Sequence, residues 1–303
     1  MYISSQNYIY SFSSTNKPVA RVNPGTTVTF QTLDCSTNRV MSDNDIAPIP
    51  VTQVNPATGP VWIEGAEPGD VLALSIRDIR LGPQAHIKLI PELGVCQGLV
   101  ETPLTRVYSI KDGWIQFSSN IRIPVNPMVG VIGNAPLVEP VPTAFGGLHG
   151  GNLDNKLLRK GVTIYLPVFH YGALLAVGDL HASMGEGELC GLAMEASGEV
   201  DLQVNLIKKK KLSCIIGEDA AVIFACGYYD FLEEAIEKIA TEFGKFLSDL
   251  LSISLGEAVL LISAAANFHF CQCAPNAGGV SCRLEIARDI CGLGQQRCFS
   301  EIM

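Results

Sequence analysis

The sequence predicts a mainly β protein of the α+β class, with sandwich-like or barrel-like sheets and two late helices packed on them. Two observations lead to this expectation. Short apolar or alternating runs bounded by Gly, Pro or Asn occur up to about residue 206, and such runs are typical of strands. Apolar residues at convincing helical spacing appear only after residue 230. Strands followed by helices indicate an α+β architecture.

The first 80 residues are predicted to be β-structure. Residues 27–33 alternate between apolar and polar side chains, and residues 71–76 form a buried-looking apolar run. Pro68-Gly69 marks a turn, because proline presets φ and glycine accepts the left-handed conformation. Residues 36–58 are rich in Ser, Asn, Asp and Pro. We expect this segment to be a loop that reaches the functional site.

Residues 81–145 contain short predicted strands between proline-rich loops, which we expect to pack over a pocket. Residues 198–206 alternate cleanly and predict a further strand. The organisation that follows is an N-terminal β-rich domain at 1–140, a catalytic hairpin region with an α+β portion at 141–290, and a tail at 291–303.

Two helices are predicted near the end of the chain. From Asp230, apolar residues recur at the spacing of an amphipathic helix up to residue 250. Asp230 with Glu233 has the form of a capping box, and Ser254 with Glu257 repeats it ahead of a second helix ending near residue 266.

Composition excludes several classes of function. The chain has 303 residues, a formal net charge of −9, and 48% hydrophobic against 17% charged residues. Nucleic acids and anionic membranes require clustered basic surface, and the one basic run, at 208–211, is short. No signal peptide is visible, and the longest apolar stretch is far shorter than the roughly 20 residues of a membrane span. We therefore expect a cytoplasmic protein whose ten cysteines are mostly reduced and buried.

The polar residues of a reaction centre are concentrated between residues 146 and 188. Two clusters lie there, His149-Gly-Gly-Asn-Leu-Asp and Asp179-Leu-His-Ala-Ser-Met-Gly-Glu-Gly-Glu, separated by a segment with strand character. The pattern predicts a hairpin-like unit with a polar cluster at each end.

The second cluster has the spacing of a metal site. If residues 178–182 are extended, Asp179 and His181 point to the same face. Imidazole with carboxylates suits zinc, whereas carboxylates alone favour calcium or magnesium. The following glycines let the chain turn and bring Glu186 or Glu188 back over the site. The alternative is a polar turn with solvated carboxylates, because D-x-H is a short and common pattern.

Several segments resemble the acetamidase/formamidase family. HGGNLDN at 149–155 and YLPVFHYGALLAVGDLHASMGEGELCG at 165–191 are similar to its HGGN-x-D and GDLH segments, as are TLDC at 32–35, NPATGP at 55–60, EGAEPGDVL at 64–72 and AANFHFCQ at 265–272. The resemblance covers roughly residues 1–290. The chain departs from the family pattern at Met184, where the family usually has Gln, and at Glu186, where it usually has Asp.

The resemblance implies metal-dependent hydrolysis of short aliphatic amides such as formamide and acetamide, by a metal-activated water, in a homodimer. The expected metal ligands are His181, Asp179, His149 and Asp34, and the metal is zinc, with calcium or magnesium as alternatives. Glu188 is the expected base and Glu186 its substitute. The expected substrate-binding residues are Asn152, Asp154 and Met184.

Two other classes of function remain open. One is a thiol-dependent amidase, for which Cys190 or Cys226 would be the nucleophile. The other is a non-catalytic, metal-containing β-domain that binds a small amide-like ligand. Serine hydrolases are disfavoured, because the chain has no G-x-S-x-G elbow.

Overall fold

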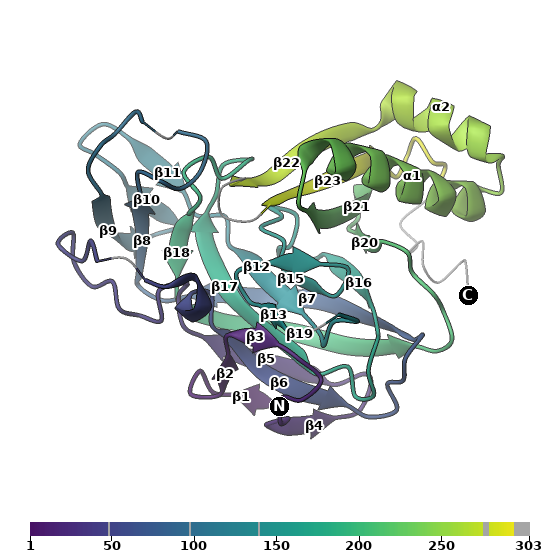
Figure 1. Ribbon diagram of the computed structural model, residues 1–303, viewed down its shortest axis with the longest axis horizontal. Helices are drawn as coiled ribbons and strands as arrows, with labels where there is room; N and C mark the ends of the chain where they lie inside the picture. The colour runs from purple at the N-terminus through teal and green to yellow at the C-terminus, as the bar shows by residue number, and fades with distance from the viewer. Residues whose placement is uncertain (48, 97, 139, 275–278, 294–303) are drawn as a thin grey trace.

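The computed structural model describes residues 1–47, 49–96, 98–138, 140–274 and 279–293, most of which lie in or between strands (Figure 1). One large sheet has nine strands. Their order across the sheet is β1 (Tyr2–Ile3), β5 (Thr27–Thr32), β19 (Gly198–Ile207), β7 (Val71–Leu81), β16 (Thr163–Pro167), β20 (Ile215–Glu218), β21 (Val222–Tyr229), β23 (Gly279–Ala287) and β22 (Asn267–Ala274).

The second large sheet has twelve strands. Nine follow the order β11 (Arg122–Pro124), β10 (Trp114–Gln116), β9 (Leu104–Lys111), β8 (Gln84–Leu89), β18 (Met194–Ala196), β17 (Leu175–Ser183), β12 (Met128–Gly133), β15 (Gly150–Asn152) and β14 (Gly146–Gly147). The other three are β6 (Ala57–Ile63), which pairs with β17, and β2 (Tyr8–Ile9) and β4 (Ala20–Val22), which pair with β6. A small third sheet joins β3 (Ser11–Phe12) to β13 (Val141–Pro142), and a short 3-10 helix, η1, spans Val51–Gln53.

The two large sheets share one apolar core. Phe30, Leu74 and Leu202 of the nine-stranded sheet belong to the same buried cluster as Val129 and Leu180 of the twelve-stranded sheet. Alternation along β5 and β19 places their apolar side chains in this core and their polar ones outside it. The packed pair of sheets confirms the predicted β-rich fold class.

Two helices complete the fold, as predicted. α1 (Leu232–Leu251) packs Ile239 and Phe243 against Ile223 of β21 and Leu284 of β23 in a second apolar cluster. α2 (Leu255–Ala265) follows α1 after a sharp bend and lies on the outside of the molecule (Figure 1). Among the described residues, neither helix alone has the length and composition of a membrane span. The two together do, with a bend of 112° between them.

The predicted capping boxes have different outcomes. Ser254 accepts a hydrogen bond from the backbone N–H of Glu257, and the Glu257 side chain accepts one from the backbone N–H of Ser254, so this box is confirmed. Asp230 does not cap α1. The N-cap is Phe231 and carries no side-chain cap, because the helix starts one residue later than predicted.

The strands predicted at 27–33, 71–76 and 198–206 are present as β5, β7 and β19, although β7 continues to Leu81. The predicted hairpin between the two polar clusters is wrong. β16 crosses to the nine-stranded sheet, whereas β15 and β17 both pair with β12 in the other sheet. Each large sheet contains strands from before and from after residue 140. A domain boundary at residue 140, as expected from the sequence, would therefore cut across both sheets. Of the predicted tail at 291–303, residues 294–303 lie outside the described residues.

Candidate active site

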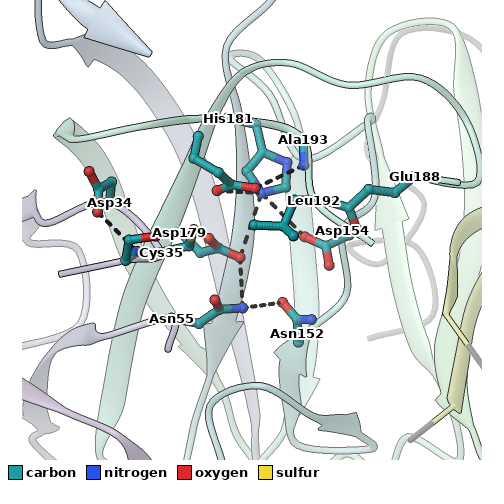
Figure 2. Close-up of polar contacts among 12 residues, drawn as sticks. Asp34, Cys35, Asn55, Asn152, Asp154, Asp179, His181, Glu188, Leu192 and Ala193 are labelled. Atoms are coloured by element: carbon teal, nitrogen blue, oxygen red, sulfur yellow. Dashed lines mark hydrogen bonds and ion pairs between the residues drawn. The ribbon is translucent and has the colours of Figure 1, made fainter. Parts of the chain in front are cut away.

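The two polar clusters of the central stretch meet across strand β12. β12 pairs with β15 on one side and with β17 on the other. Asp154 follows β15, and Asp179 and His181 lie on β17. Figure 2 shows their side chains directed toward one another. Sheet pairing therefore unites residues that the sequence separates by a strand of the other sheet.

His181 lies at the centre of a carboxylate cluster, which we define as Asp154, Asp179, His181, Glu188 and Glu195. The His181 Nε2 atom is 3.5 Å from Asp154 Oδ1, 3.6 Å from Asp179 Oδ2 and 3.5 Å from Glu195 Oε2. Glu195 stands directly opposite His181 in the pairing of β17 with β18. All five side chains are buried.

Side-chain amides support the outer atoms of the carboxylate cluster. Gln272 Nε2 on β22 donates to Asp154 Oδ2 and to Glu188 Oε2, both at 2.7 Å. Asn55 Nδ2 donates to Asp179 Oδ2 at 3.0 Å and to Asn152 Oδ1 at 3.1 Å. These amides hold a carboxylate of β17 and two from the loops after β15 and β17 in fixed positions.

Backbone conformation at the site is unusual. Asp154, Asp179 and Glu188 have φ values of 42°, 57° and 42°, in the left-handed region that non-glycine residues seldom adopt. Residues held in such conformations concentrate at functional sites. Gly130, opposite Asp179 on β12, has no room for a side chain, because a Cβ atom there would lie 2.6 Å from Asp154 Oδ1 and 2.7 Å from Asp179 Oδ2.

The pKa values of the carboxylate cluster are strongly perturbed. Burial raises the pKa of Asp154 to about 7. Burial, followed by the nearby charge of Asp154, raises the pKa of Glu188 well above its ordinary value, and burial does the same for Glu195. Burial alone would lower the pKa of His181, but the charges of Glu195 and Asp179 outweigh it and raise that pKa. The cluster therefore holds protons that exposed carboxyl groups would release.

The carboxylate cluster fits a divalent cation. Asp154 Oδ1, Asp179 Oδ1 and Glu195 Oε2 are buried and have no hydrogen-bond donor among the described residues. Buried carboxylate oxygens without a donor are costly unless a proton or a cation compensates them. Ligand atoms of Asp154, His181 and Glu188 lie within 4.8 Å of one another, and so do those of Cys35, Asp179 and Glu195. Imidazole and carboxylate oxygens are a ligand set for zinc or a similar divalent ion.

Two predicted metal ligands lie outside the carboxylate cluster. Asp34 Oδ1 accepts hydrogen bonds from the backbone N–H groups of Ser36 and Asn38, and Asp34 Oδ2 lies 3.6 Å from His86 Nδ1. Asp34 thus closes a turn, and burial raises its pKa to about 6. The ring of His149 packs edge-on against Phe12 with centroids 5.2 Å apart.

Glu186 and Met184 also point elsewhere. Glu186 forms a two-pronged ion pair with Arg283, at 2.8 and 3.0 Å, and its side chain is 36% exposed. Met184 packs with Met128 and Ala193 in a small apolar cluster. Of the predicted pair of bases, only Glu188 lies in the carboxylate cluster. The predicted substrate residue Asp154 also belongs to it, with Oδ1 3.5 Å from His181 Nε2.

Sequence reasoning missed Glu195, Gln272 and Asn55 as site residues. Glu195 had a signal, because a single acidic residue within the apolar run 193–196 indicates a buried carboxylate. Asn55 and Gln272 lie in segments that carry the family resemblance, but their pairing with Asp179 and Asp154 depends on contacts 124 and 118 residues apart. Nothing local in the sequence predicts such contacts.

An apolar pocket of about 290 Å³ adjoins the carboxylate cluster. Asn55, Asn152, Gln272 and Cys35 are among the residues that line it. Residues from the segments 36–58 and 81–145 line its walls. The first segment was predicted to reach the functional site and the second to pack over a pocket. The pocket is the space beside the cluster in which a small molecule fits.

Cys190 and Cys226, the predicted thiol nucleophiles, have no catalytic surroundings. Cys190 Sγ donates to the Leu192 carbonyl oxygen at 3.3 Å, and Cys226 is buried in the main apolar core. Burial raises the pKa of both thiols, that of Cys226 to about 12. Cys35 is the thiol beside the carboxylate cluster, and burial raises its pKa well above the ordinary value. These thiols are not activated as nucleophiles.

Comparison with known proteins identifies a family. Residues 12–141 and 139–248 match the model of the acetamidase/formamidase family. The formamidase of Methylophilus methylotrophus is 26% identical, over 63% of this chain and 61% of that protein, and the acetamidase of Mycolicibacterium smegmatis is 29% identical, over 55% and 57%. The chain therefore spans about three fifths of the length of these curated relatives.

Solved structures match over nearly the whole chain. An acetamidase from Bacillus halodurans superposes with a TM-score of 0.91 at 34% identity, covering 95% of this chain and 98% of that one. A predicted acetamidase/formamidase from Thermoanaerobacter tengcongensis gives the same TM-score and identity, covering 95% and 96%. These similarities extend through both large sheets.

Proposed function

Because the chain belongs to the acetamidase/formamidase family, we propose that it hydrolyses short aliphatic amides to ammonia and the carboxylate, using a divalent metal ion. The observation that supports this proposal most directly is the position of His181 among three buried carboxylates, several of whose oxygens have no donor among the described residues. Perturbed ionisable groups that converge beside a pocket are typical of catalytic sites.

Asp154, Asp179, His181 and Glu195 are the proposed metal-binding residues, with zinc as the proposed ion. Their burial and their donor-free oxygens support this assignment. When bound, such an ion would polarise the amide carbonyl and lower the pKa of a water molecule. Asn55 holds Asp179, and Gln272 holds Asp154, so both carboxylates keep their orientation when the site is filled.

Glu188 is the proposed proton carrier. Amide hydrolysis requires that a proton leaves the attacking water and that one reaches the departing nitrogen. Burial raises the pKa of Glu188, so its carboxyl group keeps a proton to a higher pH than an exposed one does and has a proton to pass on. Gln272 Nε2 donates to Glu188 Oε2 and so fixes the orientation of this carboxyl group.

Asn152 is the proposed substrate-orienting residue. It lines the apolar pocket, and its Oδ1 atom accepts a hydrogen bond from Asn55 Nδ2 at 3.1 Å. Met184 is buried and packs with Met128 and Ala193. We propose that Met184 shapes the site through packing, in place of an orienting amide.

Ammonia release from acetamide and formamide by the purified protein tests the proposal, before and after chelation, with metal content measured on the same sample. We expect activity to disappear on chelation and to return with one divalent ion. Glu188→Gln should abolish activity. Glu186→Gln is the matched control, since Glu186 lies two residues away but pairs with Arg283, and it should keep most of the activity.

Other outcomes would assign other functions. Loss of activity in Glu186→Gln but not in Glu188→Gln would move the base role to Glu186. Activity that survives metal removal but not thiol alkylation would support a cysteine route, with Cys35 as the residue to replace. Metal binding without turnover of any amide would support the non-catalytic alternative.

We further propose a homodimer located in the cytoplasm. The compartment is supported by nine described cysteines that are all unpaired, as in reducing environments. The dimer is supported by the exposed apolar side chains of α2, including Leu255, Val259 and Leu260. Light scattering on the native protein and on Leu260→Glu tests the dimer, and we expect the variant to be a monomer.

A further inference from the structure

The apolar pocket is built for more than a formyl or acetyl group. Three separate segments supply its aliphatic walls, all within reach of the carboxylate cluster. The lining side chains are Ile49, Val51 and Val54 around η1, Ile90 and Leu93 after β8, and Leu192 between β17 and β18. Polar lining residues next to the cluster are Asn55, Asn152 and Gln272, which bond to its carboxylates directly or through a neighbour. The pocket therefore has a polar end beside the reaction centre and an aliphatic remainder.

The volume of the pocket exceeds what the smallest amides require. The pocket measures about 290 Å³, close to the lower end of the roughly 300–1,000 Å³ typical of small-molecule sites. With roughly 30 Å³ per heavy atom, the share of one water molecule in the liquid, formamide would fill less than a third of it. An amide of six carbons, with eight heavy atoms, would fill most of it.

Charge in the pocket excludes ionic acyl groups. Lys88 is the cation among the lining residues, and its Nζ atom donates to the backbone carbonyl of Ala47 at 2.9 Å. One of its N–H groups is thereby engaged by the protein. The carboxylate of Glu92 also lines the pocket, so the walls carry one positive and one negative charge. The neighbouring carboxylate cluster would also repel an anionic substrate. An uncharged aliphatic chain is the chemistry that these walls accept.

We propose that the preferred substrates are primary amides with an uncharged aliphatic acyl group of roughly four to six carbons, whose chain occupies the apolar pocket while the amide lies at its polar end. This inference rests on the proposed amidase function. Burial of each additional methylene against the aliphatic wall raises kcat/KM roughly fourfold, until the chain fills the pocket.

A series of straight-chain amides from formamide to octanamide tests the inference on the metal-loaded protein. The measured quantity is kcat/KM from ammonia release for each member. We expect a rise from acetamide to butanamide of roughly sixteenfold, at fourfold per methylene, an optimum between butanamide and hexanamide, and a fall beyond it.

Two pocket variants should move this optimum in opposite directions. Ala144→Leu fills part of the pocket, so the optimum should shift to shorter amides. Ile90→Ala enlarges the pocket, so longer amides should be hydrolysed better relative to butanamide. Ala264→Leu, the same substitution on the exposed surface of α2, is the matched control and should leave the chain-length profile unchanged.

The outcomes separate the inference from the function on which it rests. If formamide or acetamide has the highest kcat/KM and the values fall with chain length, the inference is wrong and the amidase function stands. A profile that neither Ala144→Leu nor Ile90→Ala shifts would also overturn it. If no amide in the series releases ammonia, the proposed function fails and the inference fails with it.

Discussion

Two of the buried charged groups, one in each large sheet, have their charge balanced in different ways. In the nine-stranded sheet, Glu218 accepts hydrogen bonds from Tyr165 Oη at 2.6 Å and from Arg288 Nη1 at 2.7 Å. Each carboxylate oxygen has a donor, and within the described part of the chain the cation Arg288 pairs with the anion Glu218. In the twelve-stranded sheet, four acidic side chains of the carboxylate cluster surround the single imidazole of His181.

The difference separates structure from function. A buried charge with its full set of partners maintains the fold, because nothing further is needed to offset its desolvation. A buried excess of negative charge with donor-free oxygens is unfavourable in the folded protein by itself. Such an excess is maintained when a ligand compensates it. Substitutions in the carboxylate cluster should therefore lower activity more than stability, whereas substitution of Arg288, the partner of Glu218, should lower stability more than activity.

The largest expected effect is on catalysis. Glu188→Gln should lower kcat by about 10²–10⁴-fold, the range for loss of a general acid or base. The free energy of unfolding should stay the same or rise, because a carboxyl group leaves a crowded acidic site. Steady-state kinetics and urea denaturation on the same preparation measure both. A variant that is less stable but fully active would contradict the functional assignment.

Arg288→Met should show the converse pattern. It leaves the buried Glu218 without its cation and should lower the free energy of unfolding by about 3–5 kcal/mol, measured by urea denaturation. The kcat of the folded fraction should not change. Adding Glu218→Gln to this variant should restore part of the stability, since both charges are then removed. A strong loss of kcat in folded Arg288→Met would remove the distinction between the two groups.

Gly130→Ala tests the packing of the carboxylate cluster. The added methyl group would contact Asp154 and Asp179 at less than van der Waals distance, so both carboxylates must move. Displacement on the order of 1 Å costs about 10²-fold in rate, and kcat/KM should fall by that amount. Gly256→Ala, on the surface of α2, is the control and should be fully active, because a Cβ atom there would meet only Ser254 Oγ, at 3.9 Å. Wild-type kinetics for Gly130→Ala would mean that the cluster tolerates rearrangement.

Metal removal should lower the Tm of the protein through the carboxylate cluster and should not act through the Glu218–Arg288 pair. An ion present at 100 times its Kd stabilises the folded state by about 2.7 kcal/mol, so chelation should lower the Tm. Asp154→Asn should abolish most of this response, whereas Arg288→Met should retain it. Differential scanning calorimetry with and without chelator measures the shift. Equal melting temperatures in both conditions would count against a metal at this site.

The smallest expected effect is a pH dependence of opposite sign at two buried aspartates in the metal-free protein. Asp154, with its pKa raised to about 7 by burial, favours the folded state least above pH 7 and more as the pH falls toward 4. For Asp70, burial would raise the pKa, but hydrogen bonds from Lys208 and two backbone N–H groups lower it overall, so its stabilising effect is complete above about pH 4 and is lost below it.

Asparagine variants make the two signs measurable. At pH 8 with chelator, Asp154→Asn should raise the free energy of unfolding, whereas Asp70→Asn should lower it by about 1–3 kcal/mol, the range for hydrogen bonds to a charged group. Acidification should shrink both differences. Changes of the same sign at pH 8 would show that burial acts alike on both carboxylates.

Local patterns predicted the elements well and their assembly poorly. Alternation located β5 and β19, and the spacing of Ser254 and Glu257 located the start of α2, because these features depend on neighbouring residues. The pairing of β15 and β17 with β12 depends on contacts that no local pattern encodes. The hairpin prediction failed for this reason.

The same limit applies to the site. Asp179 and His181 are two residues apart and were predicted to face the same site, and in the structure Asp179 Oδ2 lies 3.6 Å from His181 Nε2. The prediction that the two side chains share a face assumed regular extended backbone, whereas Asp179 adopts a left-handed conformation. Glu195 and Gly130 reach the site through sheet pairing, and Gln272 reaches it from a strand of the nine-stranded sheet. Single-sequence reasoning did not nominate them for this reason.

Gln272 reaches back over 84 residues to Glu188 and over 118 residues to Asp154. It is the last of these residues to leave the ribosome. At about 5–20 residues per second, several seconds separate the synthesis of Asp154 from that of the side chain that holds it. During this interval the nascent chain carries unheld carboxylates, and the site becomes complete only when β22 joins the sheet near the end of translation.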